Sequence, residues 1–310
     1  MPLTLIEQSQ HIVLIAHKNP DADSLGSACA FYSYLLRLNK KITLFCVSKE
    51  IHPNLRFLPW SEKLTDRFPE DGDCMISFDC GSNGRIGIEK NIPLINIDHH
   101  QSNNFYGVVN IINTSAISTT EVVYDFFVAN DIKINDKIAL SLYAGLLDDS
   151  KCFSDSECSA KTFDMARSLI QAGADHRLCV EWLFQRASLS SLRIKGVLLK
   201  EMKLFGNGQL ARFDVSRALM EESGASLFEC KKVLDQALGM RSVKAAIMVL
   251  EHPHGGVKIS LHTDGSINAS EVMEHFGGGG HIKRAGGRLK QENSSMVVEE
   301  MMRMILKELV

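Results

Sequence analysis

Three short apolar segments in the first hundred residues each end in acidic or imidazole side chains. These segments are residues 12–16 (IVLIA), 75–78 (MISF) and 94–97 (LINI), and residues 42–47 form a fourth apolar run. Helical spacing follows the first segment over residues 24–38. Continuous apolar strands that alternate with helices are typical of a mostly parallel sheet covered on both faces. The sequence therefore predicts an α/β fold with polar groups gathered at strand ends.

The middle of the chain has the spacing of helices. Helical segments are expected at residues 119–129, 136–147, 159–172 and 180–202. The first is preceded by Ser118, with Glu121 three residues later, which is the pattern of a capping box. Gly173 is suited to end the third helix, because glycine adopts the left-handed conformation of a helix end at little cost.

Strands and glycines return after about residue 205. Residues 245–251 and 257–262 are expected to be strands, and residues 295–309 a final helix. These features predict a second, smaller α/β domain. The expected division is a first domain at residues 1–185, a helical connector at 186–204 and a second domain at 205–310.

Composition limits the classes of function. The 310 residues carry 37 acidic and 34 basic side chains, a net charge of −3, which gives no basic field for a long duplex nucleic acid. Every apolar run is far shorter than the ~20 residues of a membrane-spanning helix, and the N-terminus does not resemble a signal peptide. Eight scattered cysteines without a Cys-x-x-Cys pair indicate reduced thiols. We therefore expect a cytoplasmic protein, not bound to a membrane, with a small phosphorylated substrate; a homodimer is left open.

The first polar cluster lies directly after the strand at residues 12–16. It places His17, Asp21 and Asp23 between that strand and the next helix. Ligands bind at such strand ends in α/β sheets, and carboxylates combined with an imidazole suit Mn²⁺ or a similar ion. The alternative is a polar loop in which Asp23 or Ser24 caps the helix, and this cluster alone does not decide between them.

Three further clusters have the same character. The second strand ends in Asp79, the third in Asp98, His99 and His100, and the helix at 136–147 in Asp148 and Asp149. Adjacent histidines on an extended backbone point in different directions, so one can bind a metal while the other faces a substrate. Asp98 can accept a hydrogen bond from a ligating imidazole, and acids at a helix C-terminus favour compensation by a cation. Each cluster alone has a plainer explanation as a turn or solvated loop, but together they supply ligands for two cations.

A glycine run marks the second domain. Residues 277–280 are all glycine, and His281, Lys283 and Arg284 follow. Consecutive glycines let backbone amides approach an anion closely. We interpret the run as a substrate-binding loop, with a flexible loop as the alternative.

The order of these motifs resembles that of the DHH phosphoesterase family, and the glycine run with its histidine resembles the family's C-terminal DHH-associated domain. The resemblance covers nearly the whole chain. It implies that the first domain is catalytic, with one divalent cation held by His17, Asp21 and Asp79. The second cation would be held by Asp23, Asp79, His99 and Asp149. His100 is the implied catalytic group facing the substrate, and the implied substrate-binding residues are Gly278, Gly279, Gly280, His281 and Arg284.

The resemblance also implies the cofactors and the chemistry. We expect two Mn²⁺ ions, with Mg²⁺ or Co²⁺ as alternatives, and four carboxylates formally balance two such ions. Paired metals roughly 3.5–4 Å apart can activate a water and clamp the attacking and leaving oxygens of a phosphoryl group.

The domains of the chain limit the range of expected substrates. The chain is shorter than RecJ-type exonucleases, lacks the membrane and sensor segments of large cyclic-dinucleotide phosphodiesterases, and differs from family II pyrophosphatases in its glycine run. It is similar to the small nanoRNase and 3′-phosphoadenosine-5′-phosphate (pAp) phosphatase type. The implied function is hydrolysis of very short oligoribonucleotides to mononucleotides and of pAp to AMP. The alternatives are a cyclic or linear di-AMP phosphodiesterase, and a nucleotide-binding regulatory protein without catalysis.

Three positions depart from the family pattern. Arg284 stands where a small residue is usual, His262 lies near a position where relatives often carry arginine, and Lys151 stands where glycine is common. The first two affect how the substrate is held, and Arg284 offers a replacement for the missing arginine. The third affects the rim of the metal site.

Overall fold

A computed structural model describes residues 2–48, 51–252, 255–290 and 294–309. The chain forms two compact units, Met1–Arg186 and Ala187–Val310. None of the helices in these described parts combines the length and the apolar character that crossing a bilayer requires.

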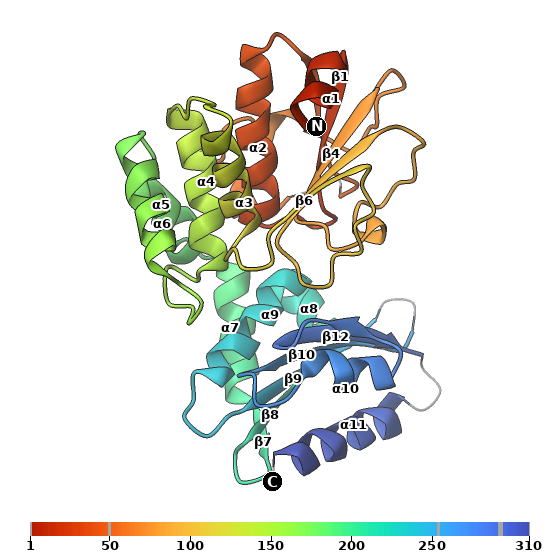
Figure 1. Ribbon diagram of the computed structural model, residues 1–310. Helices are drawn as coiled ribbons and strands as arrows, with labels where there is room; N and C mark the ends of the chain where they lie inside the picture. Colours follow the sequence, from red (N-terminus) through yellow and green to blue (C-terminus); the bar gives the residue numbers. More distant parts are fainter. Residues whose placement is uncertain (1, 49–50, 253–254, 291–293, 310) are drawn as a thin grey trace. The chain divides into compact units, whose positions relative to one another are not determined.

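The first unit is built on a six-stranded sheet in which all neighbouring strands are parallel (Figure 1). Its strands are β1 (His11–Ala16), β2 (Lys41–Phe45), β3 (Leu64–Thr65), β4 (Cys74–Phe78), β5 (Leu94–Asp98) and β6 (Val109–Ile112). Their order is β3-β2-β1-β4-β5-β6, so the direction of winding reverses between β1 and β4. Ligands of such sheets bind outside the carboxyl ends of the strands at this reversal. The predicted α/β class and mostly parallel sheet are confirmed.

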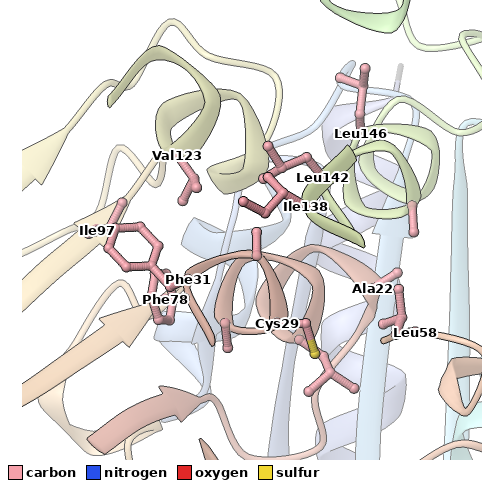
Figure 2. Close-up of a cluster of buried hydrophobic side chains, with 14 of the residues drawn as sticks. Ala22, Cys29, Phe31, Leu58, Phe78, Ile97, Val123, Ile138, Leu142 and Leu146 are labelled. Atoms are coloured by element: carbon pink, nitrogen blue, oxygen red, sulfur yellow. The ribbon is translucent and has the colours of Figure 1, made fainter. Parts of the chain in front are cut away.

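Helices cover one face of this sheet. They are α2 (Ala22–Arg37) and α3 (Thr119–Ala129), and α4 (Asp136–Asp149) packs on both of them. Helices α5 (Ala160–Gln171) and α6 (His176–Val180) pack in turn on α4, and α1 (Pro2–Gln8) lies at the start of the chain. Phe31 of α2 lies against Phe78 of β4, with ring centroids 5.1 Å apart (Figure 2). Both rings are fully buried, so replacing Phe31 with alanine would cost about 3–5 kcal/mol of stability.

The opposite face of the sheet is covered by irregular segments. Phe68, Ile86 and Tyr106 from the connecting segments pack there against Val13 and Ile15 of β1. The sequence predicted a sheet covered on both faces, and on this face loops and a 3₁₀ turn provide the cover.

Two local predictions needed correction. Ser118 caps α3 by accepting a hydrogen bond from the Glu121 amide, but the Glu121 carboxylate accepts from the Ile117 amide at 3.2 Å, so the expected reciprocal capping box is not formed. The expected helix at residues 180–202 is also interrupted. A π-helical turn at Glu181–Gln185 ends at Arg186, whose backbone is extended, before a new helix begins.

The second unit is a six-stranded mixed sheet between two layers of helices. Its strands are β7 (Lys203–Phe205), β8 (Leu210–Val215), β9 (Ala245–Glu251), β10 (Val257–Thr263), β11 (Gly279–Gly280) and β12 (Arg284–Leu289), in the order β11-β12-β10-β9-β8-β7. Its helices are α7 (Leu189–Lys200), α8 (Arg217–Ser223), α9 (Leu227–Leu238), α10 (Ala269–His275) and α11 (Ser294–Glu308). Side chains of β9 alternate between the layers. Ile247 packs with α10 and α11, and Met248 packs with α7 and α9.

Candidate functional site

His17 is the first residue after β1, and its ring is buried. Its Nδ1 lies 3.0 Å from the Lys18 carbonyl oxygen, which can only accept, so in the neutral ring Nδ1 carries the proton and Nε2 the lone pair. Nε2 lies 3.5 Å from Asp21 Oδ2 and 3.2 Å from Asp79 Oδ2, and it has no hydrogen-bond partner among the described residues. Burial lowers the pKa of His17, yet Asp21 and Asp79 raise it to about 10. This position therefore strongly favours a positive charge.

Asp79 lies at the centre of the cluster. It follows β4 with a left-handed backbone, φ 59°, which is a strained conformation for a residue other than glycine. Its Oδ2 faces His17, while its Oδ1 lies 3.6 Å from His99 Nε2 and accepts a hydrogen bond from Thr119 Oγ1 at 3.0 Å. The carboxylate thus lies between two imidazoles, which is the position expected for a ligand shared by two cations.

His99, the residue after β5, is held in the same way as His17, with Nδ1 against a backbone carbonyl oxygen. Its Nδ1 lies 3.1 Å from the Ala116 carbonyl oxygen, which leaves Nε2 as the acceptor. Nε2 lies 3.4 Å from Asp149 Oδ2 at the end of α4. The ring is thereby fixed in both tautomer and direction by a backbone partner, as is usual for a metal-ligating histidine.

Two carboxylates complete the cluster. Asp23 is fully buried in the first turn of α2 and accepts the Thr119 and Thr120 amides at 2.7 and 2.8 Å. Burial and the neighbouring charge of Asp79 raise the pKa of Asp23 to about 7. Burial, followed by the charges of Asp23 and Asp79, also raises the pKa of Asp149 well above its ordinary value. Carboxylates this close are fully ionised only beside a cation.

The ligand atoms fall into three groups, and within each group they lie within 4.8 Å of one another. The groups are His17–Asp21–Asp79, Asp23–His99–Asp149 and Asp79–His99–His100. These side chains have the donor types and the spacing to bind metal ions. All six metal ligands expected from the sequence therefore lie together, at the reversal between β1 and β4 where sheets of this class bind ligands.

Asp148 and Asp149 have different surroundings, although they are adjacent. Asp148 Oδ2 accepts the Ala22 amide at 3.1 Å, at the start of α2, while Asp149 faces His99. After Ser150 the backbone is left-handed at Lys151 (φ 50°), and it stays so over the next two residues. Glycine, which the family resemblance led us to expect at position 151, adopts this conformation at the least cost.

His100 is oriented differently from the two expected metal-binding histidines. Its Nδ1 lies 2.7 Å from Asp98 Oδ1 and 3.3 Å from Asp79 Oδ1. Since Asp98 is fully buried and its carboxylate accepts, Nδ1 carries the proton and is not a metal ligand in this geometry. Asp98 had been expected to serve a ligating imidazole; of its two neighbouring histidines, it bonds the ring of His100 and only the backbone amide of His99.

The glycine run of the second unit is more ordered than a loop. Gly279 and Gly280 form the edge strand β11, paired with β12, and the His281 and Arg284 backbones close the turn between them. A Cβ atom at Gly278 would lie 2.7 Å from the Gly286 carbonyl oxygen, and one at Gly280 would lie 2.5 Å from the Arg284 carbonyl oxygen. A Cβ atom at Gly279 would meet nothing within 4 Å. Packing therefore explains glycine at 278 and 280 but not at 279.

Arg284 stands directly opposite His262 on the neighbouring strand β10. Asp235 of α9 contacts both: its carboxylate lies 2.8 Å from His262 Nδ1 and 3.2 Å from the Arg284 guanidinium. Sequence analysis missed Asp235, because its partners are distant in the chain. Thr119, which bonds both Asp23 and Asp79, was likewise expected only as the first residue of a helix.

Two family models match the chain. The model of the DHH family N-terminal domain matches residues 11–146, and the model of the DHHA1 domain matches residues 214–308. The chain carries a DHH-family N-terminal domain followed by a DHHA1 domain. The first match runs from the start of β1 into α4 and includes every expected metal ligand except Asp149, which lies three residues beyond it.

Curated relatives of this chain extend over nearly its whole length. The bifunctional oligoribonuclease and PAP phosphatase NrnA of Thermus thermophilus is 26% identical over 96% of this chain and 90% of its own length. The protein of the same name from Bacillus subtilis is 24% identical over 90% and 89%. The cyclic-di-AMP phosphodiesterase GdpP of Bacillus subtilis is 26% identical over 96% of this chain, which spans 48% of GdpP.

Solved structures support the fold. An exopolyphosphatase-related protein from Bacteroides fragilis superposes with a TM-score of 0.88 at 21% identity, over 98% of this chain and 96% of that one. RecJ of Thermus thermophilus, solved in complex with Mn²⁺, gives a TM-score of 0.53 at 12% identity, over 97% of this chain and 52% of that one.

Proposed function

We propose that this chain is a metal-dependent phosphoesterase that hydrolyses very short oligoribonucleotides to mononucleotides and pAp to AMP. The similarity to NrnA proteins over about nine-tenths of both chains supports the substrate class. One observation of the structure carries the reaction class: the Asp79 carboxylate lies between the Nε2 atoms of His17 and His99, with further carboxylates beside each.

In this proposal, His17, Asp21 and Asp79 hold one cation. The other is held by Asp23, Asp79, His99 and Asp149. Bound cations supply charge for the phosphoryl oxygens and lower the pKa of a water. Mn²⁺ is the expected ion because the donors mix carboxylates with imidazoles, and Mg²⁺ and Co²⁺ are the alternatives.

The remaining groups act on the substrate. Asp98 fixes His100 Nδ1, which leaves Nε2 to face the substrate. In the charged ring, Nε2 also carries a proton and donates a hydrogen bond to the leaving oxygen or the phosphate. Gly279 presents an edge strand without side chains, and Arg284 carries a positive charge beside His262. In the proposal the glycine run, His281 and Arg284 bind the nucleotide substrate. Arg284 takes the place of the arginine common near position 262 of the family pattern.

The decisive experiment is a substrate panel with Mn²⁺. Purified protein is given di- to pentaribonucleotides, pAp, cyclic di-AMP, linear di-AMP and pyrophosphate, beside an Asp79→Ala variant. We expect turnover of short RNA and pAp by the wild type and a near-complete loss in the variant. Intact RNA and pAp would exclude the proposed substrates, and equal turnover by both proteins would exclude the metal site.

The same substrate panel distinguishes the proposed function from two alternatives. A preference for cyclic or linear di-AMP would follow the similarity to GdpP. Nucleotide binding without turnover would indicate a regulatory protein, although a regulatory protein has no physical need for the complete set of carboxylates. We further propose that the protein acts in the cytoplasm, which the free state of all eight cysteines supports. We also propose that it does not associate with a membrane.

A further inference from the structure

Asp98 orients His100, and a second residue orients Asp98. The Asp98 carboxylate is fully buried, and its Oδ1 accepts the His99 amide at 2.9 Å and His100 Nδ1 at 2.7 Å. Its Oδ2 accepts a hydrogen bond from Asn103 Nδ2 at 2.6 Å. Two donors therefore hold one carboxylate oxygen, and Asn103 holds the other.

Asn103 is itself rigidly held. It is buried, its Oδ1 accepts the Phe105 amide at 2.8 Å and Asn96 Nδ2 at 3.0 Å, and its Nδ2 also lies 3.3 Å from the Cys80 carbonyl oxygen. These partners determine the orientation of the amide, because Asp98 and Cys80 offer acceptors and Phe105 offers a donor. An exposed loop asparagine would have no such set of partners.

We infer that Asn103 is a positioning residue of the phosphoesterase site, which fixes the Asp98 carboxylate and, through it, the direction of the His100 imidazole. Without Asn103, one buried oxygen of Asp98 would lose its donor, and the carboxylate could turn about its terminal torsion, which has only broad minima. The His100 ring would turn with it. The inference rests on the proposed function, since it concerns the group proposed to face the substrate.

The test is a double-mutant cycle between Asn103 and His100. Asn103→Ala is expected to lower kcat about 10–100-fold, the usual effect of removing a residue that orients a reacting group. In a His100→Ala background the same substitution should change kcat by less than about 2-fold, because residues that act as a unit are strongly non-additive. An equal loss in both backgrounds would overturn the inference. Asn103→Leu, which has a side chain of similar size but no donor, serves if the alanine variant does not fold.

Tyr106→Phe is the matched control. Tyr106 belongs to the same connecting segment and donates to the same Cys80 carbonyl oxygen at 2.9 Å, but the other partner of its hydroxyl is Ser77 rather than Asp98. If Asn103 only anchored this segment, the two variants would behave alike. We expect Tyr106→Phe to lower thermal stability and to be additive with His100→Ala.

A measurement without substrate separates this inference from the proposed function. Long-range ¹H–¹⁵N correlation spectra of the imidazoles should show a single Nδ1–H form for His100 in the wild type and a mixture in Asn103→Ala. A wild type that turns over no substrate but shows this change would refute the function and keep the positioning role. A His100 spectrum unaltered by Asn103→Ala would refute the positioning role, whatever the activity.

Discussion

The metal cluster of the first unit and the glycine hairpin of the second are built in opposite ways. In the cluster, Asp23 is 0% and His17 2% exposed, and backbone groups bond the carboxylate of one and the ring of the other. In the hairpin, His281 and Arg284 are exposed, and Gly279 presents backbone alone. Metal ligands must be fixed before the ion arrives, whereas a substrate-binding surface must stay accessible. Substitutions in the cluster should therefore lower kcat, and substitutions in the hairpin should raise KM.

The largest expected effect comes from Asp79→Asn. Asparagine tolerates the left-handed backbone of this position and keeps an acceptor for Thr119, but it removes the shared charge. We expect kcat with saturating Mn²⁺ to fall by about 10⁴-fold or more, as when a central catalytic group is removed. Initial rates on a diribonucleotide measure this. If Asp79→Asn raised KM and left kcat unchanged, the cluster would not differ from the hairpin in the way proposed.

Thermal melting provides the control for this variant. Mn²⁺ at about 100 times its Kd should stabilise the wild type by about 2.7 kcal/mol, or roughly 5–10 °C for a unit of this size. In Asp79→Asn the shift should disappear, while the melting temperature in chelator should be no lower than that of the wild type, because one of several repelling carboxylates is gone. A full Mn²⁺ shift in the variant would contradict the bridging role.

The next effect compares two neighbouring acids. Asp149→Asn should lower kcat by about 10²–10³-fold, because it removes a carboxylate that faces His99 in the cluster. Asp148→Asn should cost less than about 10-fold, because its carboxylate bonds the Ala22 amide and asparagine retains an acceptor. The pair has the same chemistry and differs only in direction. Equal losses would show that proximity to the site, rather than ligation, governs the effect.

A smaller effect is expected at Arg284 of the hairpin. Arg284→Gln should raise KM for pAp about 10–100-fold, the value of one or two charge-assisted hydrogen bonds, with kcat changed much less. Arg303→Gln is the matched control, since this exposed arginine belongs to the same unit but lies on α11, paired with Glu299. Steady-state kinetics of both variants measure the difference. If Arg284→Gln lowered kcat and left KM unchanged, the hairpin would act in the chemical step, as the metal cluster is expected to, and not in substrate binding.

The metal cluster was predictable because its signals are local. Each strand end is visible as an apolar run followed by His17, Asp79 or Asp98, and the parallel sheet brings these ends to one edge. What the sequence could not show is which side chain bonds which. The pairing of Asp98 with His100, and the choice of Ile117 rather than Ser118 as partner of Glu121, depend on backbone directions that no spacing specifies.

The second unit was less predictable because its short strands form only by pairing with segments that are distant in the sequence. The strands β7, β11 and β12 and the seven-residue helices α8 and α10 are too short to show a clear periodicity, and the glycine run was expected to be a loop. The longer helix α9 is amphipathic and begins with a capping box of Ser226 and Glu229, signals that the sequence carries and that were missed. Gly279 and Gly280 are strand residues only because β12 lies beside them. Residues with a low intrinsic preference for strands can therefore form a strand when a neighbouring strand pairs with them.

The smallest expected effect separates two adjacent glycines. At Gly278 a methyl group would lie 2.7 Å from the Gly286 carbonyl oxygen, so Gly278→Ala should destabilise the second unit by about 1–3 kcal/mol. At Gly279 a methyl group would meet nothing within 4 Å, so Gly279→Ala should change stability by less than about 0.5 kcal/mol. If an anion approaches this backbone closely, the same methyl group should still raise KM by about 3–10-fold, the effect of roughly 1 kcal/mol in binding. Urea unfolding and steady-state kinetics on pAp measure both quantities. An unchanged KM in Gly279→Ala would mean that the glycine run serves the hairpin alone, and the substrate would have to be held by side chains such as Arg284.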